Sequence, residues 1–181
     1  ISNAVYDYGK GFIYTGWGAF CLNYWGLGSD GIINMLPVII EGGQSNALWL
    51  EGYENALDII YPSEITEGVL SFWTQYADYT NSIKDGSQVH ATFSNGASAI
   101  TSWEYGLGKV VYLGHIYMGS LEMYSNENLF EEESPIRLLT NSVDWTIGDV
   151  ASSGCTDESA CNYDPDATED DGSCAYEEDC A

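Results

Sequence analysis

The segment from residue 101 to residue 115 constrains the fold more than any other part of the chain. It reads TSWEYGLGKVVYLGH. Gly106 and Gly108 tolerate the positive φ angles of a tight turn, so the residues on either side are predicted to pair as two strands. Val110–Leu113 is a continuous apolar run, the pattern of a strand that is buried on both faces. This strand leads to His115, and open α/β sheets bind their ligands at the carboxyl ends of strands.

Other strands are predicted from the same kind of pattern. Residues 88–93 alternate between polar and apolar side chains, so they are expected to pair with a strand at 98–105. That strand is expected to pair in turn with 109–114. Residues 12–15 form a short apolar run that favours a buried strand, and a further strand is predicted to begin at Val69.

The clearest helix is predicted to follow these strands. Ser134 can cap it, Pro135 fits its first position, and Gly148 ends it. A shorter helix is predicted to end at Gly9, and another to cover 19–27. The stripe of the long helix that we expect to face the core contains Ile136, Leu139, Val143 and either Trp145 or Ile147.

Four segments resemble a known family. SWEYGLGKVVYLGH at 102–115 and PIRLLTNSVDWTIG at 135–148 resemble the C-terminal part of class I glutamine amidotransferase-like domains, above all the ThuA-like branch. YPSEITEGV at 61–69 and KGFIYTG at 10–16 resemble two further motifs of that branch. The resemblance implies an α/β fold for residues 1–149. The expected sheet is flavodoxin-like or amidotransferase-like, either partial or completed by another segment.

The catalytic residues of that family are incomplete in this sequence. True amidotransferases use a cysteine nucleophile at a strand-to-helix elbow and a histidine base. Here the elbow is Gly16-Trp17-Gly18, which has no thiol, and Cys21 follows too late, so it is expected to be a buried free thiol. His115 matches the family's histidine but lacks the glutamate that orients it. We therefore expect no enzymatic activity, and a hydrolase using His115 is the least favoured alternative.

The resemblance to ThuA-like domains implies a small polar or sugar-like ligand near the strand that ends at His115. The alternative for each aromatic candidate is simple packing in the core or on the surface. His90 lies on an alternating strand with no acid nearby in sequence, so a structural role is expected for it. The candidate ligand-binding residues are Trp17, Tyr61, Glu104, His115 and Tyr117.

The last 27 residues form a separate acidic module with four of the five cysteines. A linker is predicted at 150–154, and the module at 155–181. Such clustering indicates disulfides and an oxidising compartment. The module closely resembles the CTDxxACNYxPxAxxDDGSC repeat of large secreted and surface proteins of bacteria. Four cysteines allow three pairings, and the resemblance favours Cys155–Cys174 and Cys161–Cys180.

Four carboxylates of the module lie within eight residues and suggest a cation site. Hard cations such as Ca²⁺ prefer oxygen ligands, although the spacing is not that of an EF-hand loop. The alternative is an acidic, solvated spacer held by disulfides. The candidate Ca²⁺ ligands are Asp164, Asp166, Asp170 and Asp171.

The charge of the chain limits its partners. Only 4 Lys and Arg residues face 28 Asp and Glu residues, which gives a formal net charge of −24. This charge argues against nucleic acid or an anionic membrane as a partner, and no apolar run reaches the length of a membrane span. We expect a secreted, non-catalytic structural or surface protein that associates with itself or with other surface proteins, for example as the subunit of a filament. The alternative is a domain that binds a carbohydrate or another small polar ligand.

Overall fold

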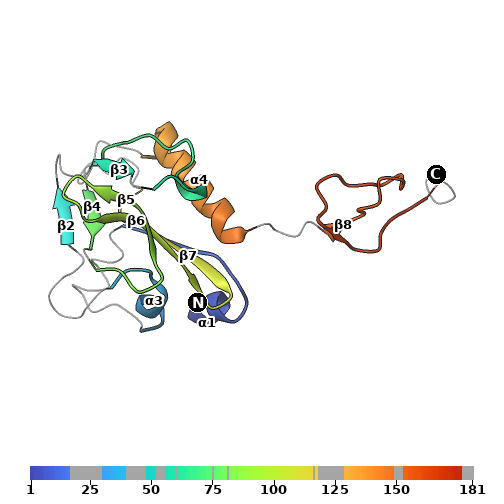
Figure 1. Cartoon of the computed structure of the whole chain (residues 1–181), viewed down its shortest axis with the longest axis horizontal. Coiled ribbons are helices and arrows are strands. Elements are labelled where there is room, and N and C mark those ends of the chain that lie inside the picture. The colour runs from blue at the N-terminus through green and yellow to red at the C-terminus, as the bar shows by residue number, and fades with distance from the viewer. Residues whose placement is uncertain are drawn as a thin grey trace. The chain divides into compact units, whose positions relative to one another are not determined.

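The computed structural model describes residues 1–16, 30–39, 48–51, 56–59, 61–74, 76–80, 82–115, 117, 129–148 and 153–176 (Figure 1). The chain divides into two compact units, Ile1–Ile147 and Gly148–Ala181. The division falls close to the predicted end of the α/β region at residue 149. The predicted helix at 19–27, together with Trp17, Cys21 and Cys180, lies outside the described residues.

A five-stranded mixed sheet forms the centre of the first unit. Its strand order is β1-β7-β6-β5-β3. β1 runs parallel to β7, whereas the other three neighbouring pairs are antiparallel. The expected α/β class is therefore correct. The five strands are β1 (Phe12–Thr15), β3 (Leu57–Ile59), β5 (Gln88–Phe93), β6 (Ser98–Tyr105) and β7 (Gly108–Leu113).

The hairpin predicted at 101–115 is confirmed. β6 and β7 pair from Ile100↔Leu113 to Tyr105↔Gly108, and Gly106 at the turn has a φ of 64°. The predicted pairing of β5 with β6 is also present, with register irregularities on either side of Ala91. All four residues of the apolar run in β7 have no exposed surface, which confirms a strand covered on both faces.

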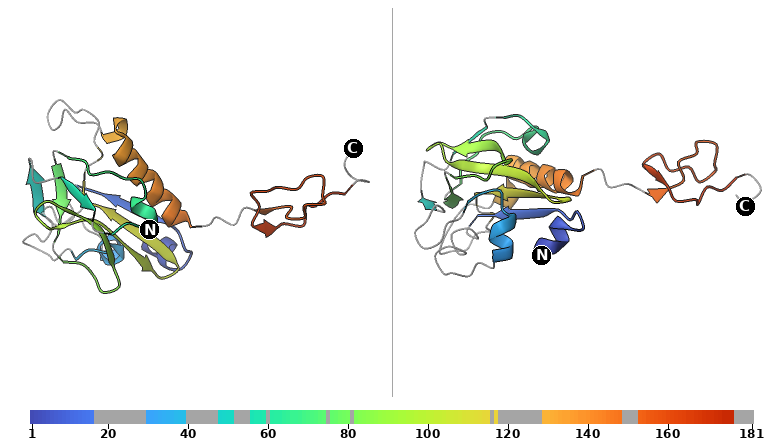
Figure 2. Two further views of the ribbon diagram at one scale, coloured as in Figure 1. Left: turned by 45° about the horizontal axis from the view of Figure 1, so that its top comes forward. Right: turned by 60° about the horizontal axis from the view of Figure 1, so that its bottom comes forward.

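Helices lie on both faces of this sheet (Figure 2). Successive residues of β7 point to opposite faces. On one face, Val111 and Leu113 pack in the same cluster as Leu138 of α4 (Glu133–Ile147). On the other face, Val110 packs with Val5 and Met35. These two residues belong to α1 (Ser2–Tyr6) and α3 (Asp30–Met35).

The long helix is present, but it begins at Glu133, so Ser134 is not its cap, and half of the stripe expected to face the core is wrong. Gly148 follows α4 with a φ of 70°, as a C′ glycine should. Ile136, Val143 and Ile147 are exposed, whereas Leu139 and Trp145 pack against the core from partly buried positions. The hydroxyls of the buried polar residues reach carbonyls of their own helix, which allows them to face the sheet. The buried residues of α4 are Pro135, Leu138, Ser142 and Thr146.

Four shorter elements complete the described part of the first unit, and two predictions about this unit are corrected here. β2 (Leu48–Glu51) and β4 (Tyr76–Tyr79) form an antiparallel pair. No strand begins at Val69, because this residue closes a turn after η2 (Glu64–Thr66) by donating its N–H to the Thr66 carbonyl. α1 ends at Tyr6, so Gly9 is not its C′ residue. A second 3-10 helix, η3 (Leu129–Glu131), precedes α4.

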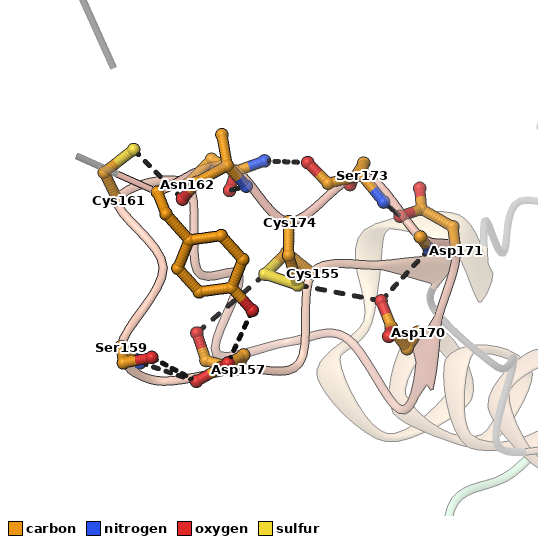
Figure 3. The surroundings of a disulfide bond; sticks show 12 residues. Cys155, Asp157, Ser159, Cys161, Asn162, Asp170, Asp171, Ser173 and Cys174 are labelled. Carbon is orange, nitrogen blue, oxygen red and sulfur yellow. Dashed lines mark hydrogen bonds between the residues drawn. A yellow bond between two sulfur atoms is a disulfide. The ribbon is translucent and has the colours of Figure 1, made fainter. Parts of the chain in front are cut away.

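The second unit has little regular structure and is held by cross-links. β8 (Ser153–Gly154) and β9 (Glu169–Asp170) form a short parallel pair. Cys155 and Cys174 form a disulfide, as the resemblance implied (Figure 3). The Asn162 side chain donates to the Ser173 carbonyl and accepts from the Ala175 N–H. The other expected pair, Cys161–Cys180, stays a prediction because Cys180 is not described.

Candidate functional site at the carboxyl ends of two parallel strands

The parallel strands β1 and β7 bring their carboxyl ends together beside His115. The Gly16 N–H donates to the His115 carbonyl at 3.1 Å. His115 also pairs with Ala77 of β4, and the Asp78 N–H donates to the Gly114 carbonyl at 2.7 Å. Three strands thus fix the backbone around the histidine, at the edge where α/β sheets place ligands.

The imidazole of His115 lies among aromatic rings. Its centroid is 5.2 Å from that of Phe72 and 4.8 Å from that of Tyr117. Tyr117 in turn lies 5.4 Å from Phe130, and its hydroxyl donates to the Pro135 carbonyl at 2.6 Å. That hydrogen bond ties the aromatic cluster to the first turn of α4.

His115 is a buried polar group that no described residue satisfies. The residue has no exposed surface, and neither Nδ1 nor Nε2 has a hydrogen-bond partner among the described residues. Burial lowers the pKa of His115 to about 3, so the ring is neutral at physiological pH. A neutral imidazole can donate from one nitrogen and accept at the other. The ring can therefore donate one hydrogen bond to a polar ligand and accept another from it.

The structure brings together only some of the predicted ligand-binding residues. His115 and Tyr117 are neighbours, and Trp17 lies outside the described residues. Glu104 is exposed and pairs with Lys109 near the turn of the hairpin. Most of β7 therefore separates it from His115, so Glu104 does not belong to this site. Tyr61 is 54% exposed.

A second polar constellation escaped the sequence analysis. His90 Nδ1 lies 2.9 Å from Ser63 Oγ, and His90 Nε2 lies 2.7 Å from Ser102 Oγ. Burial lowers the pKa of His90 to about 4. These two contacts fit the structural role that we expected for His90. The two serines that make them come from the cap of η2 and from β6. No sequence spacing links such distant positions, so no sequence signal could have found them.

This constellation borders an open pocket of about 580 Å³. Ser63 caps η2, and its N–H donates to Thr66 Oγ1 at 2.9 Å. Its hydroxyl lies 3.3 Å from Thr66 Oγ1 and 2.9 Å from His90 Nδ1, so both residues hold it at the pocket wall. The residues that line the pocket are Pro62, Ser63, Thr66, Glu67, Gly68 and Val69.

The acidic module does not present the predicted Ca²⁺ ligands as a set. Within the described residues, no group of three or more His, Cys, Asp or Glu side chains could hold a metal ion. Asp164, Asp170 and Asp171 each accept a hydrogen bond from the N–H two residues later (Figure 3 shows the last two). Hydrogen bonds to Ser173 lower the pKa of Asp171. In this structure the three carboxylates shape turns instead of converging on one point.

Comparisons with known proteins leave the family unassigned. No family model matches the chain, and no curated protein matches it. Among the solved structures that share its fold are two from Salmonella typhimurium. Cytoplasmic protein STM3548 has a TM-score of 0.62 at 15% identity and covers 77% of this chain. Cytoplasmic protein STM1381 has a TM-score of 0.62 at 16% identity and covers 81%. The chain spans only 56% and 58% of their lengths.

The comparison corrects one expectation about location. Both solved structures are of cytoplasmic proteins, which contradicts the secreted or cell-surface location that we expected. That location was inferred from one short cysteine-rich segment, and a disulfide in such a segment does not by itself fix where a whole chain resides. In the described part of the chain, no helix is long and apolar enough to cross a membrane.

Proposed function

We propose that the α/β unit binds a small polar ligand of sugar-like chemistry at the carboxyl ends of β1 and β7. One observation carries this proposal: the fully buried imidazole of His115 has two ring nitrogens without a partner in the described structure. An unsatisfied buried polar atom costs about 1–3 kcal/mol. A ligand hydroxyl that bonds to either nitrogen would recover part of this free energy on binding.

The surroundings of His115 suit such a ligand. Phe72 and Tyr117 place aromatic rings against the imidazole, and small-molecule sites combine apolar walls with a few polar groups. Because His115 has no exposed surface, binding requires a covering side chain to move. Tyr117 is partly exposed, so its ring is the one that we expect to move aside.

The resemblance to ThuA-like domains supports the same location. In that family the strand that ends in Gly-His lies beside the ligand site, and Gly114 and His115 occupy the matching positions. In this proposal the sheet is a variant of the amidotransferase-like fold. The proposal involves no cysteine nucleophile, since Gly16-Trp17-Gly18 at the elbow has no thiol.

Titration calorimetry of the full chain with glucose, maltose and trehalose tests the proposal. We expect at least one of these sugars to bind, and His115→Phe to weaken its binding at least tenfold. Glu104→Gln is the matched control and should leave the affinity unchanged, because Glu104 lies near the other end of β7. Failure of all three sugars to bind, or equal affinity in the His115→Phe variant, would refute the proposal.

A further inference from the structure

We infer that Ser63 is a nucleophile for acyl transfer, with His90 as its general base, in the open pocket beside η2. This pocket is distinct from the site proposed at His115. Two serine hydroxyls and one histidine imidazole, from three separate segments, meet there. No described residue of this constellation is needed for the ligand site at the strand ends.

Ser63 and His90 are placed as a nucleophile and its base. Ser63 Oγ lies 2.9 Å from His90 Nδ1, within the distance that proton transfer requires. Ser63 is partly exposed and lines the pocket, whereas His90 is only 5% exposed behind it. An acyl group in the pocket can therefore reach the serine oxygen, while the base stays shielded from water.

Ser102 orients the imidazole of His90 from its other side. Ser102 Oγ lies 2.7 Å from His90 Nε2 and is 2% exposed. With Nε2–H donating to Ser102, Nδ1 carries the lone pair that accepts the Ser63 proton. Ser102 thus acts as a positioning residue, in the place that a carboxylate holds in serine hydrolases. A hydroxyl stabilises the imidazolium less than a carboxylate would, so turnover should be slow.

The chemistry that this arrangement allows is hydrolysis of a small ester. Ser63 Oγ forms a bond to the acyl carbon, its proton passes to His90 Nδ1, and the leaving alcohol takes that proton as its C–O bond breaks. Water then attacks the acyl carbon and gives a proton to His90 Nδ1, which returns it to Ser63 Oγ as the acyl–serine bond breaks and the carboxylic acid leaves. Nothing is oxidised or reduced, and ester and water are the only reactants.

Labelling of the full chain with a fluorophosphonate, followed by peptide mass spectrometry, tests the inference. The phosphorus–oxygen bond should form at Ser63 with loss of fluoride. Ser71→Ala is the matched control, because Ser71 lies in the same segment and its hydroxyl donates to the Leu57 carbonyl at 2.6 Å. We expect about 10²-fold slower labelling of Ser63 in the His90→Gln variant, and no change in Ser71→Ala.

The pH profile separates this mechanism from ordinary serine reactivity. Because the pKa of His90 is about 4, labelling should rise through pH 4 and stay flat from pH 6 to pH 8. A serine without a base would instead react faster with rising hydroxide concentration. Ser102→Ala should slow labelling and Ser102→Thr should restore it. The inference fails if wild-type Ser63 reacts no faster than Ser71, an outcome that needs no variant, or if His90→Gln labels normally.

Discussion

Gly11 lies directly against Thr146 of α4. A Cβ atom built on Gly11 would be 2.7 Å from Thr146 Cβ and 2.8 Å from the Thr146 carbonyl oxygen. The absence of a side chain at residue 11 therefore allows the C-terminal turn of the helix to approach the segment that enters β1. This contact sets the distance between α4 and the parallel pair that carries the proposed ligand site.

Gly11→Ala should destabilise the α/β unit. The added methyl group meets backbone as well as side-chain atoms, so the helix must shift, and overpacking of this kind costs about 1–3 kcal/mol. Urea denaturation of the variant measures this loss. The adjacent exposed Lys10→Ala serves as the control and should change the free energy of unfolding by less than about 0.5 kcal/mol. Equal stability of the two variants would contradict the close contact.

Two aliphatic residues of α4 provide a direct test of its orientation. Leu138 has no exposed surface, whereas Ile136 is 42% exposed. Leu138→Ala should cost about 2–5 kcal/mol because it leaves a cavity in the core, and Ile136→Ala should cost under about 1 kcal/mol. The comparison of their urea midpoints decides between the observed face and the one expected from the sequence. A larger loss for Ile136→Ala would support the expected stripe instead.

The two histidines should respond in opposite ways to replacement by phenylalanine. His115→Phe removes two unsatisfied nitrogens from an aromatic cluster, so it should raise the free energy of unfolding by about 1–3 kcal/mol. His90→Phe leaves the Ser63 and Ser102 hydroxyls without their shared partner, so it should lower stability by a similar amount. Thermal unfolding measures both. A loss of stability in His115→Phe would mean that its ring is satisfied in solution.

Stability should fall as the pH decreases from neutral. Burial lowers the pKa of His90 to about 4 and that of His115 to about 3, while a histidine in the unfolded chain has a pKa of about 6.5. The unfolded chain therefore binds more protons below pH 6.5. Each histidine should lower the free energy of unfolding by about 1.2 kcal/mol between pH 6 and pH 5.

Urea denaturation at a series of pH values checks this dependence. The free energy of unfolding should be nearly constant from pH 7 to pH 8 with respect to these two groups. His115→Phe should remove about half of the slope between pH 6 and pH 5. A slope that is the same in the variant and the wild type would show that His115 is not responsible.

The second unit should depend on its disulfide. Cys155 and Cys174 are 19 residues apart, and closing a loop of that length contributes about 3 kcal/mol. Replacing both by serine should expose residues 153–176 to limited proteolysis. In the same variant, the α/β unit (Ile1–Ile147) should melt within about 2 °C of its wild-type temperature. Continued protease resistance of the segment would show that hydrogen bonds such as those of Asn162 suffice.

Self-association stays a prediction from the sequence. A filament is expected from the sequence, and no described feature of the structure tests it. Light scattering of the purified chain measures its size in solution. A uniform monomer would contradict self-association, independently of the proposals for His115 and Ser63.

The sequence by itself determined the hairpin, the helix that ends at Gly148 and the position of His115 at a strand end. These features follow from local rules: glycine at a tight turn, an apolar run over a buried strand, and a C′ glycine after a helix. The Cys155–Cys174 pair followed from a resemblance over a short segment. Each of these signals lies within a few consecutive residues.

Only the tertiary structure decided which face of α4 is buried and which polar groups meet. The helix turns Ser142 and Thr146 inward because their hydroxyls bond to its own backbone. Hydropathy alone therefore placed Ile136 and Val143 in the core by mistake, although it placed Leu139 and Trp145 correctly. Pairing of β5 with β6 brings His90 and Ser102 together, and the segment of Ser63 reaches them through the hydrogen bond from the Tyr61 N–H to the His90 carbonyl. Glu104 and His115 belong to one hairpin, yet the length of β7 keeps them apart. Long-range packing carries this information, and no local pattern contains it.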